Sequence, residues 1–403
     1  MGAQIDPLSS HRRALSAPSG PRPKENLMSQ STPRRSFLKG AGAAGAGLLI
    51  TTPKIAFGSQ ANSALTLGMI GCGNRGMYVS GIFAKHEYLK INAVCDIYDD
   101  KITAATQKYS GAKAFKNYKD LLATNVDAIY IATPAFLHPE HVEAGIMAKK
   151  HIFCEKPVGV DTAGCKRVIA AAKKADPTKR ISFDFQQRYG KDYRKVHALM
   201  KSGELGAIQM VRAAWLGNGP GIKSGHAAQE ERIRNWFFYR ELSGDIVIEQ
   251  DCHNIDVVHW FVGKHPVRVS GYGGRLARSY GDIYDNIVLS YQFDDGRTFS
   301  YSANQFGSGT GWSDVSETFI CEKGTINVGR KGYTVFRPKM PNEVVETKYD
   351  ITQDAVNEFI DGARTGKLEN FAHDAAVSTL TAYMGLRSAV EGCEMTWSDV
   401  WNG

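Results

Sequence analysis

A glycine-rich turn between two predicted strands constrains this sequence more than any other feature. The apolar run 65–70 has the composition of a buried parallel strand, and it leads directly into GCGNRG at residues 71–76. A second apolar run begins at Ile91 and ends in an acid, Asp96, twenty residues beyond the last glycine. This spacing predicts a dinucleotide-binding βαβ unit.

Each position of this turn has a physical role. Gly71 permits the tight turn, Gly73 leaves room for a pyrophosphate beside the backbone, and Gly76 lets the helix pack closely on the strand. A helix is predicted from Met77 to about Lys85, and Asn74 and Arg75 lie just before it, where the free N–H groups of a helix N-terminus attract phosphate. We therefore count all five residues among the cofactor-binding positions.

The acid at the end of the second strand indicates which dinucleotide binds. Asp96 can accept hydrogen bonds from both hydroxyls of the adenine ribose, and it would repel a 2′-phosphate. We therefore expect NAD rather than NADP.

Predicted strands and helices continue to alternate up to residue 154. Further strands are expected near 114–115, 128–132 and 151–154, with helices near 98–109, 117–123 and 138–149. Alternation of this kind is typical of an α/β fold with a doubly wound parallel sheet. We assign residues 65–186 to this Rossmann domain.

The distribution of charge argues against a nucleic-acid partner. The formal net charge is +8, but the first 64 residues carry +6 of it, so the remaining chain is close to neutral. The seven cysteines are scattered without metal-ligand spacing. We read them as mostly buried thiols and expect no metal site.

Residues 33–50, PRRSFLKGAGAAGAGLLI, resemble a twin-arginine (Tat) signal peptide. Arg34, Arg35 and the following Phe-Leu-Lys match that pattern, although its usual Ser is replaced. The apolar stretch 41–50 is too short and too weakly apolar to span a bilayer stably. We expect residues 1–64 to be a disordered segment followed by this signal, and the protein to reach the periplasm through the Tat machinery. An ordinary secretory leader with a chance arginine pair is the alternative.

A second motif, Glu155-Lys156-Pro157, follows the predicted strand at 151–154. This motif resembles one found in the Gfo/Idh/MocA oxidoreductases. Four other segments resemble motifs of the same family, namely GCGNRG (71–76), ATPAFLH (132–138), FQQRYG (185–190) and EQDCHNID (249–256). The resemblance covers nearly the whole chain after the leader. It implies further cofactor-binding residues, namely Thr133, Pro134, His138, Glu155, Lys156 and Arg188.

The resemblance also implies the second domain, residues 187–403, as an α+β domain with a mostly antiparallel, open-faced sheet. We expect its strands at 207–217, 266–277, 284–294, 297–306, 316–322 and 332–338. A long helix near 372–391 should pack back on the Rossmann domain. The open face of the sheet commonly forms the interface between subunits in this family, so we expect a homodimer or homotetramer.

The resemblance places two residues at the reacting atoms. Lys156 becomes a catalytic or orienting cation, and His253 a base that takes a hydroxyl proton near neutral pH. Family dehydrogenases usually carry an Asp four residues before this His, where the chain has Glu249. Asp251 lies between them, and it is either a further catalytic candidate or a helix N-cap. Zinc binding by His253 and His259 fits badly with one helix.

These features together predict an exported oxidoreductase that moves a hydride between tightly bound NAD and a sugar or polyol. Tight binding is expected because no pool of NAD exists outside the cytoplasm. Tyr189, Trp215 and Trp236 are weaker candidates for stacking on a sugar ring. One alternative is an NAD-dependent glycosidase that oxidises, eliminates and reduces again, like glycoside hydrolase family 109. Another is a ligand-binding protein without catalysis, against which Lys156 and His253 together argue.

Overall fold

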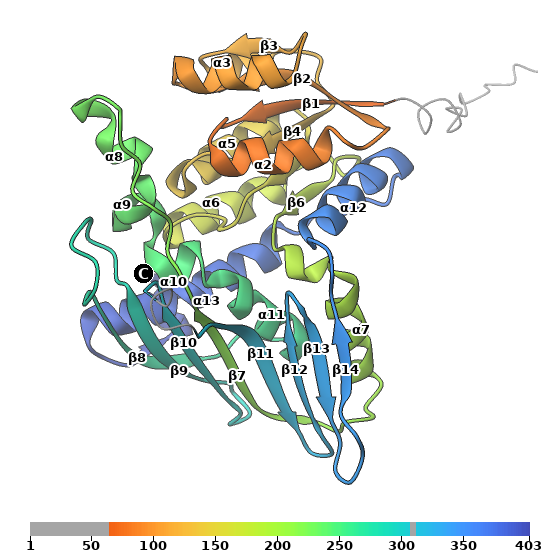
Figure 1. The fold of residues 1–403 in the computed structure, drawn as a ribbon, viewed down its shortest axis with the longest axis vertical. Helices are drawn as coiled ribbons and strands as arrows, with labels where there is room; N and C mark the ends of the chain where they lie inside the picture. The colour runs from red at the N-terminus through yellow and green to blue at the C-terminus, as the bar shows by residue number, and fades with distance from the viewer. Residues whose placement is uncertain (1–63, 307–311) are drawn as a thin grey trace, which may run out of the picture. The chain divides into compact units, whose positions relative to one another are not determined.

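The computed structural model describes residues 64–306 and 312–403. The predicted disordered segment and Tat signal, apart from Ala64, lie outside the described residues. The described residues belong to one compact unit, 56–403, that contains two β-sheets (Figure 1). None of the helices within the described residues is both long and apolar enough to cross a membrane.

Sheet A has six parallel strands in the order β3-β2-β1-β4-β5-β6. This is the strand order of a Rossmann fold, and it confirms the predicted doubly wound sheet. The central strands are buried along their whole length, as their continuous apolar runs require. The strands are β1 (Leu65–Ile70), β2 (Leu89–Cys95), β3 (Lys113–Phe115), β4 (Ala128–Ile131), β5 (His151–Cys154) and β6 (Ile181–Phe183).

Five helices connect the strands of sheet A. They are α2 (Asn74–Phe83), α3 (Asp99–Lys108), α4 (Tyr118–Leu122), α5 (His138–Met147) and α6 (Thr162–Ala172). The first of them starts inside the glycine-rich turn, three residues before the predicted helix, because the turn delivers the chain directly into a helical conformation at Asn74. A side-chain cap begins α6, where Asp161 accepts a hydrogen bond from the backbone of Gly164 at 2.7 Å.

Sheet B has nine strands, and all neighbours are antiparallel except β7 and β10. All six predicted strands are present, and three short strands that the sequence did not indicate, β12, β14 and β15, complete the sheet. The strands are β7 (Ile208–Leu216), β8 (Arg268–Gly274), β9 (Asn286–Gln292), β10 (Thr298–Asn304), β11 (Asp314–Cys321), β12 (Thr325–Gly329), β13 (Gly332–Phe336), β14 (Glu343–Glu346) and β15 (Met395–Thr396).

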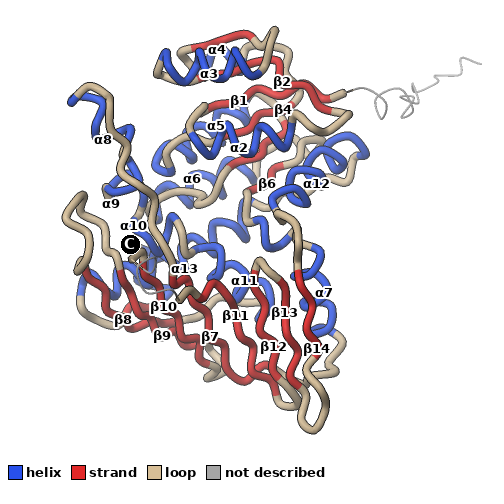
Figure 2. Tube along the Cα trace, in the orientation of Figure 1, coloured by secondary structure: helices blue, strands red, loops and turns tan. Residues whose placement is uncertain are grey.

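Helices cover the face of sheet B that is turned toward sheet A (Figure 2). The other face is open, and exposed and buried residues alternate along β9 and β10 for this reason. The helices of this part are α7 (Lys191–Lys201), α8 (Glu231–Arg234), α9 (Arg240–Ser243), α10 (Asp245–Glu249), α11 (Cys252–Val262), α12 (Thr352–Thr365), α13 (Ala372–Glu391) and α14 (Trp397–Asn402).

The long helix α13 has the predicted bounds and lies between the two sheets. It packs against α6, and the hydroxyl of Thr379 accepts a hydrogen bond from the backbone of Val158 at 3.2 Å. The last long helix thus lies against α6, a helix of the segment 65–186. Residues of the second sequence half therefore reach the carboxyl ends of the sheet A strands.

Candidate functional site

A pocket of about 330 Å³ lies at the carboxyl ends of β1, β2 and β4. Gly71, Gly73, Asp96, Thr133 and Pro134 line it, so five of the predicted cofactor-binding residues meet there. Ligands bind at this edge of open parallel sheets.

The glycines leave the space that a pyrophosphate needs. Gly71 has a φ of +96°, and a Cβ there would lie 2.5 Å from the carbonyl oxygen of Ala132. A Cβ on Gly76 would lie 2.1 Å from the carbonyl oxygen of Gly71, so helix and turn can pack this closely only with glycine. A Cβ on Gly73 would meet no atom within 4 Å. The open space therefore lies in front of Gly73 and the start of α2, where no side chain caps the helix.

Asp96 is held in place by the backbone around it. Its Oδ2 accepts a hydrogen bond from Cys72 at 2.8 Å, and its Oδ1 accepts one from Tyr98 at 3.0 Å. The carboxylate is thus fixed at the pocket wall before any ligand arrives. This geometry fits the ribose diol of NAD.

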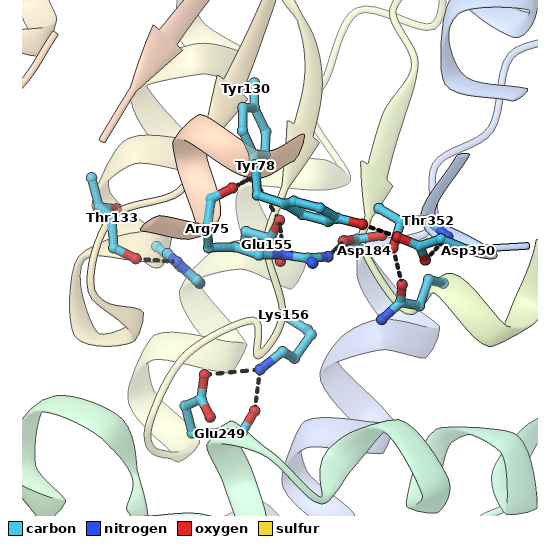
Figure 3. Close-up of polar contacts among 12 residues, drawn as sticks. Arg75, Tyr78, Tyr130, Thr133, Glu155, Lys156, Asp184, Glu249, Asp350 and Thr352 are labelled. Atoms are coloured by element: carbon cyan, nitrogen blue, oxygen red, sulfur yellow. Dashed lines mark hydrogen bonds and ion pairs between the residues drawn. The ribbon is translucent and has the colours of Figure 1, made fainter. Parts of the chain in front are cut away.

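Arg75 reaches from the first turn of α2 to two acids that directly follow strands β5 and β6 of sheet A (Figure 3). Its Nε donates to Oε1 of Glu155 at 2.9 Å, and its Nη2 pairs with Oδ2 of Asp184. The hydroxyl of Tyr130 also donates to Glu155, at 2.7 Å. Burial and the nearby Glu155 charge raise the pKa of Asp184 to about 7. Asp184 was not predicted as a site residue, although an acid directly after the short apolar run of β6 (Ile181–Phe183) was a usable signal.

An ion pair between Lys156 and Glu249 joins the segment that follows sheet A to a helix that covers sheet B (Figure 3). Nζ of Lys156, which follows β5, lies 2.9 Å from Oε1 of Glu249 at the end of α10, and it also donates to the Glu249 carbonyl oxygen. Burial alone would lower the pKa of Lys156, but the Glu249 carboxylate more than offsets it and the pKa is raised. The lysine is therefore a protonated hydrogen-bond donor at neutral pH.

His253 is a buried residue in the first turn of α11. Its ring stacks on the indole of Trp215 with centroids 6.0 Å apart, and its Nδ1 has no hydrogen-bond partner among the described residues. Burial lowers its pKa well below the usual value, and the nearby cations Arg330, Lys156 and Arg75 lower it further. The imidazole is therefore neutral at neutral pH and can accept a proton.

Asp251 stands at the N-cap position of α11, but its side chain makes no capping hydrogen bond. Its carboxyl group instead interacts with the hydroxyl of Tyr301 on β10. Burial raises the pKa of Asp251 well above the usual value of an aspartate.

His138 and Arg188 both hold other parts of the protein in place. The ring nitrogens of His138 lie 2.6 Å from the carbonyl oxygen of Pro157 and 2.9 Å from that of Thr133, and the Lys156–Pro157 peptide bond is cis. Arg188 binds Asp256 through two hydrogen bonds of 2.7 and 2.9 Å. Neither residue lines the 330 Å³ pocket. Their contact with a cofactor remains a prediction.

The three aromatic candidates lie in different parts of the structure. Trp236 lines the pocket beside Asp96, whereas Trp215 lies against His253. Tyr189 is buried, and its hydroxyl donates to Glu369 at 3.3 Å. Among the described residues, no group of three His, Cys, Asp or Glu side chains could hold a metal ion.

Residues 217–239 form one wall of the pocket, and we call this segment the strap. Apart from Trp236, its contribution to the pocket was not predicted. The strap rises from the end of β7 toward α3 (Figure 1), and its residues Lys223, Ile233, Arg234 and Trp236 line the pocket opposite the glycine-rich turn. Arg234 donates to both carboxylate oxygens of Asp100 in α3, at 3.0 and 2.8 Å. Its guanidinium also lies 4.0 Å from the ring centroid of Tyr98.

Comparison with protein families agrees with this geometry. Residues 65–183 match the model "Oxidoreductase family, NAD-binding Rossmann fold", and residues 193–327 match "GFO/IDH/MocA C-terminal domain". Together these matches cover more than half of the chain. They define an NAD-binding oxidoreductase with a Rossmann domain followed by the C-terminal domain of this family. The chain belongs to the Gfo/Idh/MocA family.

The relatives that match this chain in sequence are distant. A myo-inositol 2-dehydrogenase of Thermotoga maritima is 26% identical over 58% of this chain and 66% of its own length. An uncharacterised oxidoreductase of Bacillus subtilis, YrbE, is 26% identical over 58% of this chain and 64% of its own length. The similarity therefore spans just under two thirds of each of these relatives. A 2,7-anhydro-N-acetylneuraminate hydratase of Escherichia coli is 26% identical over 66% of this chain and 67% of that protein.

Solved structures share the whole fold. A myo-inositol 2-dehydrogenase from Lactobacillus plantarum superposes with a TM-score of 0.69 at 22% identity, covering 83% of this chain and 99% of that one. A levoglucosan dehydrogenase in complex with NADH and levoglucosan gives a TM-score of 0.71 at 17% identity, with the same coverage. At these identities the likeness establishes the fold.

The strap generates a prediction about cofactor release. Arg234→Gln removes the two charged hydrogen bonds to Asp100, so NAD should leave roughly tenfold faster, a modest effect because the pair is partly exposed. The rate is measured by stopped-flow displacement of bound NADH with excess NAD, followed by nicotinamide fluorescence. Arg232→Gln is the matched control, because Arg232 lies in the same strap, pairs with Glu241 and does not line the pocket. Equal release rates for Arg234→Gln and the unmodified protein would show that the strap does not retain the cofactor.

Proposed function

We propose that this protein transfers a hydride between bound NAD and a hydroxyl or ketone carbon of a sugar or polyol. The observation that carries the proposal is the presence of two groups that differ in protonation state, one a protonated donor and the other a neutral acceptor. Lys156 is held protonated by Glu249, and His253 is held neutral with a free Nδ1. Oxidation of an alcohol needs such a pair, one group to orient the oxygen and one to take its proton.

The residues of the chain divide this work between the two sheets. NAD supplies the hydride acceptor or donor when it is bound. Gly73 and the start of α2 would hold its pyrophosphate, and Asp96 its ribose. Nζ of Lys156 would donate a hydrogen bond to the substrate oxygen and stabilise negative charge there. His253 would take the hydroxyl proton during oxidation and return it during reduction.

The named relatives support a polyhydroxylated substrate. Inositol dehydrogenases and a levoglucosan dehydrogenase are among the proteins that resemble this chain. The redox-neutral alternative, a glycosidase cycle of oxidation, elimination and reduction, uses the same first step. Lys156 favours the dehydrogenase, because the glycosidases of glycoside hydrolase family 109 lack the lysine of the Glu-Lys-Pro motif.

Substitution of the two groups tests the chemistry. His253→Ala should lower single-turnover hydride transfer by on the order of a hundredfold to ten thousandfold and leave bound NAD in place, and Lys156→Ala should be similarly damaging to the transfer. The double variant should be little worse than the more damaging single variant, because groups that act as a unit are not additive. Nucleotide content and nicotinamide absorbance are measured for all three variants with a panel of inositols, sugars and anhydrosugars.

Two results would change this assignment. Near-normal transfer by His253→Ala would remove the histidine from the mechanism and point to Glu249 or Asp251. Release of an aglycone without net change in nicotinamide absorbance would establish the glycosidase cycle instead. Lys331→Gln serves as the control for an exposed charge change in the second domain.

We also propose that the protein is exported in the folded state through the Tat machinery and works in the periplasm. The support is the Arg34-Arg35 pattern before a weakly apolar stretch, together with a cofactor that must be loaded before export. Replacing both arginines by lysine should retain the precursor in the cytoplasm, because the paired guanidinium groups are the expected recognition feature. Cell fractionation followed by immunoblotting measures this. Unchanged export of the double variant would identify the arginine pair as incidental.

The open face of sheet B supports a proposed homodimer or homotetramer. Tyr272 on β8 and Val288 on β9 face each other across the strands and are 80% and 60% exposed. A charge at this position should weaken association, so Val288→Glu should shift the mass measured by light scattering toward the monomer. Met147→Glu, on the exposed side of α5, is the control. A monomeric unmodified protein, or a mass that Val288→Glu leaves unchanged, would contradict this interface.

A further inference from the structure

Arg330 is a cation that the proposed chemistry does not use. It lies in the turn between β12 and β13, and its guanidinium carbon is 5.0 Å from the ring centroid of Trp215. The same indole stacks on His253. Arg330 therefore lies beside the candidate base, on the side of the cleft formed by sheet B.

Arg330 makes no ion pair with any residue in 64–306 or 312–403, and its buried Nε has no hydrogen-bond partner there. The two nearby acids do not neutralise it fully. Asp184 is already paired with Arg75, and Glu317 is buried and bonded to Asn254 at 2.7 Å. Burial raises the pKa of Glu317 to about 8, so that group is mostly uncharged at neutral pH.

Other polar atoms around Arg330 also lack partners. Oδ1 of Asp184, Nδ1 of His253 and Oδ1 of Asn254 are buried without a hydrogen bond to the described residues. Buried polar groups are normally satisfied, so a cluster of unsatisfied ones indicates a place for a polar ligand. Hydroxyl groups of a sugar could satisfy these atoms, but only an anion could balance the guanidinium.

The anion that fits is not part of the cofactor. The space for the pyrophosphate lies at Gly73, on sheet A, whereas Arg330 contacts Trp215 of β7. Arg330 also lines an open hollow of about 640 Å³, together with the cations Lys331 and Lys348 and the acids Glu346 and Asp350. A ligand can therefore approach Arg330 from the surface without passing the strap.

We propose that the sugar bound at this site carries a carboxylate and that Arg330 binds that carboxylate. This inference rests on the proposed function, because it names the class of substrate for the same cleft. A guanidinium matches a carboxylate through two parallel hydrogen bonds. A sugar phosphate would bring about two negative charges to one unpaired cation, so a monoanionic sugar acid is the better match.

Binding measurements on the full chain loaded with NAD test the proposal. Isothermal titration compares hexuronates and aldonates with the neutral sugars of the same configuration and with their 6-phosphates. At least one acid should bind more tightly than its neutral counterpart and its phosphate. Arg330→Gln should weaken that binding by on the order of tenfold to a hundredfold, as expected for loss of hydrogen bonds to a charged group. Arg330→Lys should retain part of it, and Lys323→Gln, at an exposed lysine that does not line the hollow, should retain all of it.

Folding and cofactor binding provide the controls. Arg330→Gln removes an unpaired buried charge, so its unfolding temperature should be equal to or higher than that of the unmodified protein, and its NAD content unchanged. Binding of acids that is no tighter than that of neutral sugars or phosphates, or that survives Arg330→Gln, would overturn the proposal. In that case, turnover of a neutral polyol would still support the proposed dehydrogenase activity. An acid that binds through Arg330 without any nicotinamide absorbance change would support the carboxylate site and contradict the dehydrogenase.

Discussion

The ion pair between Lys156 and Glu249 is the contact on which the geometry of the site depends. It joins the carboxyl end of sheet A to the helices above sheet B, and its side chains are only 12% and 16% exposed. A buried pair of this kind contributes little net stability, but breaking it leaves an uncompensated charge. It therefore fixes where His253 stands relative to the glycine-rich turn, and it keeps the lysine protonated for hydrogen bonding.

Local patterns were sufficient to predict five of the six strands of sheet A and the first part of the site, whereas β6 (Ile181–Phe183) was not predicted. The glycine-rich turn, Asp96 and the Glu155-Lys156-Pro157 motif each lie directly after a strand, and parallel strands bring their carboxyl ends to one edge. Strand order follows from this alternation and the handedness of the connections. The bounds of α13 were also predicted, because no proline interrupts the segment before Gly392, which ends the helix in a left-handed conformation.

Residues that act through distant contacts were not predictable in this way. Arg234 and Asp100 are separated by 134 positions, and nothing in the basic strap sequence indicates that it crosses to α3. Arg330 lies between Gly329 and Gly332, a context that is typical of an exposed turn, yet its side chain reaches Trp215. Short strands such as β14 depend on pairing with β13 rather than on their own apolar pattern.

The central claim is that Lys156 and His253 serve hydride transfer to or from a cofactor that the protein retains. The most direct measurement is the nicotinamide absorbance of purified protein, with its bound nucleotide quantified after denaturation, on mixing with a panel of sugars, sugar acids and polyols. The account predicts one equivalent of NADH formed per bound NAD with at least one compound, without added cofactor. Bound NAD whose absorbance no compound in the panel changes would contradict it.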